Sequence, residues 1–329
     1  MKEILITGGA GYIGLNDTIE LIKKNISVVI VDDMKNAREE YVEHIMNTFP
    51  NHITFYKGDV CDKEYIERII QKHNFDGIIH LAARKYVGES FKIPDEYMQN
   101  NLNSLSTVLD LTTKYNIPNI MFASSVTVYG NASTMNETGK LEPISPYAES
   151  KRLGEEMIQE WHQNNKDKNV LIFRFANPLG ANSEYSIGDH PKTDSKSILS
   201  HLITHAISGE NLVLHGNNHP TKDGTSIRDY IHILDLAKIS MQVFTSGFTG
   251  FNIYNLGRGK GYSVLEMLHT TENITGKTIN HTFGEAAPGN VSVVETNIAK
   301  ITNDYNIEFS HGLDDMITTE YEFHINHKS

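Results

Sequence analysis

Short runs of apolar and β-branched residues alternate with longer amphipathic, charged stretches through the first half of the chain. The runs are mostly apolar throughout, which is typical of strands buried on both faces of a parallel sheet. The intervening stretches are long enough for helices that cover both faces. The six runs are EILIT (3–7), SVVIV (27–31), ITFY (53–56), GIIHL (77–81), NIMFAS (119–124) and VLIFR (170–174). The pattern predicts an α/β fold with a doubly wound parallel sheet of the Rossmann type.

This alternation stops near residue 180. A polar, loop-like stretch, GANSEYSIGDHPKTDSKS, is followed by a helix candidate at 197–208, then by GNNHPTKDGTS and shorter elements. We therefore expect a Rossmann domain over 1–178 and a smaller α+β substrate-binding region over 179–329, partly interleaved with the first. The ligand cleft should lie between these two parts.

A glycine motif directly follows the first predicted strand. Residues 7–14 read TGGAGYIG, so that Gly8, Gly11 and Gly14 recur at every third position and open the next helix. Such glycines let the backbone turn tightly and approach a diphosphate, while the helix N-terminus offers unpaired N–H groups and the positive end of its dipole. The motif predicts dinucleotide binding; the alternative is an incidental glycine turn.

Acidic residues end the next two predicted strands. Asp32 closes the second strand, where a carboxylate accepts hydrogen bonds from the ribose hydroxyls of NAD and repels the 2′-phosphate of NADP. The adjacent Asp33 is the alternative for this role. Asp59, in KGDV at the end of the third strand, is expected either to face the adenine or to cap the following helix.

A tyrosine–lysine pair lies in SPYAESK, residues 145–151. Tyr147 and Lys151 are one helical turn apart, so both face the same side of a helix and the ammonium could stabilise a phenolate. The alternative is a surface pair, because this spacing also arises by chance. Ser125, at the end of the fifth predicted strand, should lie at the same cleft and supports the catalytic interpretation.

Charge and composition narrow the classes of partner. The chain has 329 residues, of which 39% are hydrophobic and 21% charged, as in ordinary soluble proteins. Its 41 acidic and 29 basic residues give a net charge of −12, which argues against a broad nucleic-acid or anionic-membrane surface. A locally positive pocket for an anionic small molecule remains compatible with this charge.

The single cysteine, the lengths of the apolar runs and the spacing of two histidines each add one expectation. Cys61 is the single cysteine, so no intrachain disulfide framework is expected. The first apolar run is too short for a signal peptide, and no run reaches the length of a membrane span, which together predict a cytoplasmic protein. His201 and His205 are four residues apart, but no third ligand stands nearby, and no metal site is predicted.

Taken together, these motifs resemble the extended short-chain dehydrogenase/reductase family, and within it the UDP-glucose (UDP-galactose) 4-epimerases. The resemblance covers nearly the whole chain. The matching stretches are TGGAGYIG, KYVGES (85–90), SSVTVYG (124–130), SPYAESK, NPLGA (177–181), HPTKDGTSIRDYIHILDLA (219–237) and YNLG (254–257).

The resemblance implies residue roles. The implied catalytic residues are Tyr147 as general base, Lys151 as its partner and Ser125, which bonds the reacting sugar oxygen. The implied NAD contacts are Gly8, Gly11, Tyr12, Ile13, Gly14, Asp32, Asp59, Val60, Leu81, Ala82, Lys85, Asn100, Tyr147 and Lys151. The implied contacts to a UDP-sugar are Lys85, Ser125, Tyr129, Tyr147, Asn177 and Arg228.

The implied reaction is a redox-neutral inversion at C4 of a UDP-hexose, of the kind used in galactose metabolism. Tyr147 would act as a phenolate, with its pKa lowered toward neutrality by Lys151 and by the positive nicotinamide. Sugar 4,6-dehydratases of this family place an Asp–Glu pair after the catalytic hydroxyl residue. Here Val126 and Thr127 occupy those positions, which disfavours dehydration.

Two departures from the family pattern lie near the expected NAD site. Leu15-Asn16-Asp17 replaces small, polar and neutral residues, so that Asp17 would add negative charge near the diphosphate unless it points away. Phe175-Ala176-Asn177 replaces a Tyr-Phe-Asn run, and losing the aromatic residue widens the pocket.

Two further departures affect substrate binding. The arginine-rich loop that grips the diphosphate reads EAAPGNV, with Ala286 and Ala287 in place of arginines, and the asparagine-rich uridine loop reads KSILSHL. Arg258 and Lys260 are candidate replacements or, alternatively, solvated loop charges. Val294 aligns with a bulky residue that blocks N-acetylated sugars in some members, so UDP-N-acetylhexosamines would be admitted.

These losses keep two alternatives open. One is another NAD-dependent nucleotide-sugar oxidoreductase of the same fold, and the other is a catalytically weakened NAD-binding homologue. Family analogy also predicts a homodimer through two helices at roughly 95–115 and 147–164. The apolar residues available to that interface, which could equally pack onto the sheet, are Leu102, Leu105, Leu109, Leu153, Met157 and Trp161.

Overall fold

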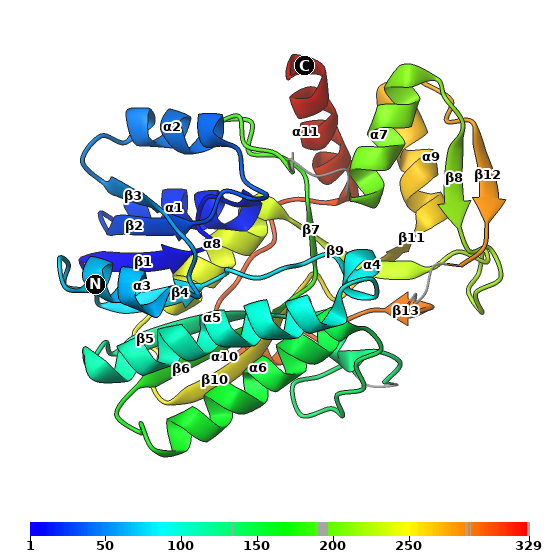
Figure 1. Cartoon of the computed structure of the whole chain (residues 1–329). Helices are drawn as coiled ribbons and strands as arrows, with labels where there is room; N and C mark the ends of the chain where they lie inside the picture. Colours follow the sequence, from blue (N-terminus) through cyan, green and yellow to red (C-terminus); the bar gives the residue numbers. More distant parts are fainter. Residues whose placement is uncertain (133–134, 190–196, 287–288, 290, 328–329) are drawn as a thin grey trace.

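A parallel sheet of seven strands forms the centre of the molecule (Figure 1). The computed structural model describes residues 1–132, 135–189, 197–286, 289 and 291–327. All six predicted strands are present, and the predicted doubly wound fold is confirmed. The strands are β1 (Glu3–Thr7), β2 (Ser27–Asp32), β3 (Ile53–Lys57), β4 (Gly77–His80), β5 (Asn119–Ser125), β6 (Asn169–Phe175) and β10 (Phe251–Leu256), in the order β10-β6-β5-β4-β1-β2-β3.

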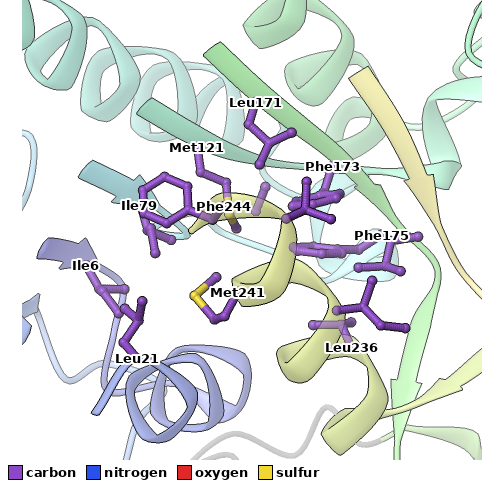
Figure 2. Close-up of a cluster of buried hydrophobic side chains, with 14 of the residues drawn as sticks. Ile6, Leu21, Ile79, Met121, Leu171, Phe173, Phe175, Leu236, Met241 and Phe244 are labelled. Carbon is purple, nitrogen blue, oxygen red and sulfur yellow. The ribbon is translucent and has the colours of Figure 1, made fainter. Parts of the chain in front are cut away.

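Helices cover both faces of this sheet, which explains why its strands are apolar throughout. One face carries α1 (Tyr12–Ile22), α2 (Glu39–Thr48) and α8 (Ile233–Phe244), and the other carries α3 (Lys63–Ile70), α5 (Pro94–Lys114) and α6 (Pro146–Gln163). Along β1, Ile4 and Ile6 pack into the first core, whereas Leu5 packs into the second. Figure 2 shows Ile6 of β1 in the first core, together with Met241 and Phe244 of α8.

A second region packs beside the sheet around a core of its own. Its helices are α7 (Ile198–Ser208), α9 (Val264–Thr275) and α11 (Leu313–Asn326). Its strands are β7 (Asn177–Leu179), β8 (Leu212–His215), β9 (Ile227–His232), β11 (Gly261–Ser263), β12 (His281–Gly284) and β13 (Val293–Val294). The short helices α4 (Val87–Ser90) and α10 (Ala299–Asp304) and a 3-10 helix (Val126–Tyr129) complete the fold.

Segments from the second half of the chain return to the central sheet. β10 pairs in parallel with β6, and α8 packs against α1. β10 and α8 therefore belong to the layers of the central sheet although both follow residue 178. The domain boundary expected at residue 178 stays a prediction. No helix in the described ranges is both long enough and apolar enough to cross a membrane.

The order of the strands places the cleft. The chain moves outward from β1 through β2 to β3, and then returns to β4 on the other side of β1. The loops after β1 and β4 therefore diverge to opposite faces, and they leave a crevice at the carboxyl ends of these strands. The glycine motif follows β1 directly, so this crevice is where it lies.

Asp17 points away from that crevice. It is fully buried between α1 and α8, where its Oδ1 accepts a hydrogen bond of 3.2 Å from Ser240 Oγ. Burial raises the pKa of Asp17 well above its ordinary value, which favours the neutral acid. The departure at this position therefore adds no negative charge to the glycine motif's binding surface.

The buried carboxyl group of Glu320 on α11 should make the stability of the protein depend on pH. Its carboxyl group is fully buried, and neither oxygen has a hydrogen-bond partner in the part of the chain that the structure describes. Burial and the charge of Asp189 raise its pKa well above the ordinary value. In the unfolded state, the carboxyl group loses its proton above a pKa of about 4.3. The folded state keeps this proton to a higher pH, so the free energy of unfolding falls as the pH rises from about 4.3 toward the folded-state pKa.

We expect Glu320→Gln to raise the free energy of unfolding at pH 8 by about 1–3 kcal/mol, because the amide needs no proton to stay neutral. At pH 4 the gain should vanish. Urea unfolding at both pH values measures this. Glu322→Gln, on the exposed side of the same helix, is the control. An equal change in the two variants at pH 8 would contradict the assignment.

Candidate active site

A cavity of about 1140 Å³ runs along the carboxyl ends of the strands and into the second region. Its wall begins at the glycine motif, passes the ends of β2, β4 and β5, and continues to α7, β8 and β9. Pockets for one small ligand usually measure about 300–1,000 Å³. The size and length of this cavity suit a dinucleotide together with a second ligand.

The glycine motif forms a cradle at one end of the cavity. Gly8 has φ +71°, and a Cβ there would lie 2.6 Å from the Ala82 backbone nitrogen, so only glycine fits. A Cβ at Gly14 would lie 2.5 Å from the Gly9 Cα. Gly11 caps α1 without any side-chain hydrogen bond, and it lines the cavity together with Tyr12 and Ile13. The first N–H groups of α1 are therefore available to a diphosphate, which fits the dinucleotide prediction.

Asp32 is held rigidly beside this cradle. It is buried, its Oδ2 accepts from Ala10 N at 3.2 Å, and its Oδ1 accepts from Met34 N at 2.9 Å. The neighbouring Asp33 instead pairs with Lys35 Nζ at 2.7 Å, although it also lines the cavity. The geometry favours Asp32 as the carboxylate that a ribose would meet.

Asp59 lines the cavity and does not cap a helix. Its carboxylate accepts from Cys61 N at 2.9 Å. The cap of α3 is Asp62, which accepts from Tyr65 N at 3.0 Å. The remaining residues expected to contact the cofactor also line the cavity: Val60, Leu81, Ala82, Lys85 and Asn100.

The catalytic candidates meet at the end of β5. Ser145 caps α6 by accepting from Ala148 N, and Pro146 occupies the first turn, so the helix begins just before Tyr147. Tyr147 lies beside Ser125, the last residue of β5, which is close enough to lower the pKa of the phenol. Lys151 Nζ donates to Ala123 O at 2.7 Å. The cavity wall includes the three candidate residues.

The Ser125 hydroxyl is oriented by Thr127, a contact that the sequence did not predict. Ser125 Oγ accepts from Thr127 N at 3.2 Å and from Thr127 Oγ1 at 3.0 Å. Because Oγ accepts these two hydrogen bonds, its own hydrogen is left available for Tyr147, whose pKa Ser125 lowers. Only the folded turn after β5 reveals this role, since the sequence does not show which way the Thr127 side chain points.

Burial dominates the titration of this centre. It raises the pKa of Tyr147 to about 12, while the bond with Ser125 lowers it. It lowers the pKa of Lys151 to about 8, while the charge of Glu155 raises it. The protein's own groups therefore do not bring Tyr147 toward neutrality as expected, because desolvation outweighs them. A positive charge beside the phenol would act in the required direction.

Two of the expected substrate contacts, Asn177 and Arg228, line the cavity. Asn177 follows β6 and donates to Asp229 O at 3.3 Å, and Arg228 of β9 extends into the same wall. Burial lowers the pKa of Arg228 but leaves it a strong base. Both side chains are placed to contact the anionic part of a ligand.

Tyr129 is not brought to the cavity. It is fully buried, its hydroxyl donates to Asn255 Oδ1 at 2.7 Å, and it accepts from Arg174 Nη1 at 2.8 Å. The hydroxyl is therefore used in the interior, and the structure does not support the expected contact of Tyr129 with a sugar. The sequence could not show that Arg174 and Asn255 approach it from other strands.

The proposed replacements for the lost arginines also lie elsewhere. The Arg258 guanidinium lies over the Phe309 ring at 5.5 Å and Lys260 Nζ lies over Tyr262 at 4.9 Å, and neither residue lines the cavity. Ala286 is exposed, whereas Ala287 lies outside the described residues, as does Lys196 of the KSILSHL stretch. Val294 is buried beside Arg228 in the β13–β9 pairing, also outside the cavity wall.

Several lining residues were missed or differently interpreted from sequence. His201 and His205 of α7 line the substrate end together with Val213 and His215 of β8. Among the residues that the structure describes, no group of three histidine, cysteine or acidic side chains is arranged to hold a metal. Phe175 and Ala176 line the wall near the catalytic candidates, where the alanine leaves room.

Comparisons with known proteins agree with this geometry. The model of the family described as "NAD dependent epimerase/dehydratase family" matches residues 4–257. A UDP-glucose 4-epimerase of Bacillus subtilis (strain 168) is 33% identical over 325 residues, which cover 97% of this chain and 96% of the relative. A UDP-glucose 4-epimerase of Caenorhabditis elegans is 36% identical over 309 residues, which cover 89% and 88%.

Solved structures give the same result. The UDP-glucose 4-epimerase of Bifidobacterium longum, solved in complex with NAD+ and UDP, superposes with a TM-score of 0.95 at 31% identity, over 99% of both chains. The enzyme of Stenotrophomonas maltophila, solved with NAD and formylated UDP-arabinopyranose, superposes with a TM-score of 0.93 at 29% identity, over 99% of this chain and 98% of that one.

Proposed function

The chain belongs to the NAD dependent epimerase/dehydratase family, and we propose that it is an NAD-dependent 4-epimerase of UDP-hexoses. One observation carries the proposal beyond family membership. Ser125, Tyr147 and Lys151 meet on the wall of a cavity that also contains the diphosphate cradle and Arg228. A hydroxyl, a general base and its cationic partner are therefore placed between a cofactor end and a substrate end.

Each of these residues has a distinct task in the proposed reaction. The glycine cradle and Asp32 would hold NAD, which would supply a reversible hydride acceptor for C4 of the sugar. Tyr147 takes the proton from the C4 hydroxyl as the hydride leaves, and gives it back when the hydride returns. Ser125 donates a hydrogen bond to the phenolate of Tyr147. Lys151 holds a positive charge one turn away and favours the phenolate.

The substrate end must hold the nucleotide while the sugar turns. Arg228 and Asn177 are the described residues of this wall that we assign to the UDP group. Val126 and Thr127 cannot act as carboxylic acids, which keeps dehydration disfavoured. Acceptance of N-acetylated sugars remains a prediction from Val294, although that side chain is buried outside the cavity wall.

Asp32 gives a test of cofactor choice. We expect Asp32→Asn to weaken NAD binding by about tenfold or more, because the ribose loses a charged hydrogen-bond acceptor, worth about 1.5–3 kcal/mol. The ratio of NADP to NAD affinity should rise, because the repulsion of the 2′-phosphate is removed. Titration calorimetry of both cofactors measures this. Asp33→Asn is the control, and a larger effect there would move the role to Asp33.

Incubation of the purified protein with NAD and UDP-galactose, without any reductant, tests the proposed function. NMR of the anomeric protons should show conversion to the gluco epimer, while absorbance at 340 nm shows no net NADH. UDP-N-acetylgalactosamine tests the Val294 prediction in parallel. Stoichiometric NADH formation would favour a net oxidoreductase, and no conversion with NAD bound would favour a weakened homologue or a different nucleotide sugar.

We also propose a homodimer in the cytoplasm. α5 and α6 lie side by side on the outer face of the sheet (Figure 1), with half-buried Leu102, Leu153, Met157 and Trp161. Leu105 and Leu109 are buried against the sheet and therefore belong to the packing alternative. Sedimentation velocity of the wild type and a Met157→Glu variant tests the interface. A single cysteine suits a reducing compartment.

A further inference from the structure

Three side chains at successive turns of α6 contact three consecutive residues of β5. Tyr147 lies beside Ser125, Lys151 Nζ donates to Ala123 O at 2.7 Å, and the Glu155 carboxylate accepts from Ser124 Oγ. Positions four residues apart share one face of a helix, so the three contacts lie along one interface between α6 and β5. The first two contacts involve catalytic candidates, whereas Glu155 has no role in the reaction described above.

Glu155 is held on its other side by a buried arginine. Arg174 of β6 donates from Nη2 to Glu155 Oε2 at 2.7 Å and from Nε to Oε1 at 3.0 Å, and the two residues are only 3% and 4% exposed. Arg174 Nη1 also donates to Tyr129, which donates in turn to Asn255 of β10. The carboxylate is thus fixed by β5, β6 and, through two intermediates, β10.

We propose that Glu155 is a positioning residue of this active site, which locks α6 onto β5 through Ser124 and Arg174 and keeps Lys151 positively charged. This inference rests on the proposed epimerase function. Ser124 immediately precedes Ser125, so its bond to Glu155 fixes the strand end that carries the hydroxyl. An error of about 1 Å in such a centre typically costs 10²-fold in rate.

The charge state of Lys151 depends on its burial and on the ionisable groups around it. Lys151 interacts with the ionisable groups of Glu155 on its own helix and of His80 on β4. Tyr147 lies one turn before it on α6, and Arg174 of β6 contacts Glu155. Burial and the charge of Lys151 lower the pKa of His80 to about 3, so His80 stays neutral. Glu155 also pairs with Arg174, so removal of the carboxylate charge would leave the positive charge of Arg174 uncompensated as well. Glu155 is then the group whose negative charge raises the pKa of Lys151, which burial has brought to about 8.

The test is Glu155→Gln, assayed in the protein with NAD bound. The amide keeps the size of the side chain and can still accept from Ser124, but it removes the charge. We expect kcat to fall about 10–100-fold, with the dissociation constant of UDP unchanged within about twofold. Without Glu155 the pKa of Lys151 drops further, so Lys151 loses its proton at lower pH. The alkaline limb of the kcat profile should therefore move to lower pH.

Glu156→Gln is the matched control, because Glu156 is the next residue of α6 and its exposed carboxylate pairs with Arg152. Ser124→Ala removes the strand contact and leaves the charge, so it should lower kcat without moving the alkaline limb. It also decides the question if Glu155→Gln does not fold. Wild-type kcat in Ser124→Ala, or an unmoved alkaline limb in folded Glu155→Gln, would overturn the inference.

Wild-type conversion of UDP-galactose is measured before any variant. If the wild type does not invert C4, the proposed function fails independently of Glu155. The charge of Lys151 can then still be compared by ¹⁵N NMR of its ammonium group in the wild type and in Glu155→Gln. Titration at the same pH in both proteins would overturn the electrostatic part of the inference without any assay of activity.

Discussion

Tyr147→Phe is expected to lower kcat for UDP-hexose epimerisation by about 10²–10⁴-fold, because general base catalysis contributes this much. The phenylalanine ring retains the packing at the start of α6, so UDP and NAD should bind as in the wild type. Any remaining activity would depend on another proton acceptor, because the phenylalanine side chain cannot take up a proton. Steady-state kinetics, with calorimetric binding of UDP, measures both quantities.

Tyr115→Phe is the matched control, because it removes a phenol that bonds Gln71 and Glu67 far from the cavity. Its kcat should equal that of the wild type. If Tyr147→Phe kept more than about a tenth of wild-type kcat, the proton would be taken by another group, and the mechanism proposed here would be wrong.

Arg174→Met is expected to cause the largest loss of stability, about 3–5 kcal/mol in the free energy of unfolding. The reason is that the Glu155 carboxylate would stay buried without its cation, and Tyr129 would lose a donor. Denaturant unfolding at neutral pH measures the loss. Part of the loss should be recovered at low pH, where a carboxyl group without its cation takes up a proton.

The double variant Glu155→Leu with Arg174→Met separates stability from catalysis. Replacing a buried ion pair with apolar residues of similar size is often neutral for stability, so most of the loss should be regained. Activity should not return, because Ser124 and Lys151 still lack Glu155. A double variant as unstable as Arg174→Met would show that the charge pair is not the cause.

The sheet and the cofactor cradle could be predicted because their signals are local. A strand such as Val28–Val31 is apolar on both faces, and the spacing of the glycines at 8, 11 and 14 is visible in one short stretch. A Cβ at Gly14 would meet Gly9 of the same loop. The carboxylate at Asp32 follows from its place at a strand end. The fifth strand likewise placed Ser125 at the cleft.

What the sequence could not show depends on contacts between distant segments. From its position after the glycine motif, Asp17 is expected to add negative charge near the diphosphate. Its carboxyl group is instead buried, where it accepts a hydrogen bond from Ser240, more than 200 residues later. Tyr129 looks like a pocket residue until Arg174 and Asn255 approach its hydroxyl. β10 completes the sheet from the second half of the chain, where shorter and more polar elements give a weaker pattern.

In the proposed reaction, C4 is inverted by a hydride that leaves and returns. The most direct test uses UDP-galactose carrying deuterium at C4, incubated with the NAD-bound protein in ordinary water and followed by NMR. If the same hydride leaves and returns, the product is UDP-glucose that retains the deuterium at C4. Exchange of the deuterium with solvent, or no UDP-glucose while NAD and UDP are bound, would contradict it.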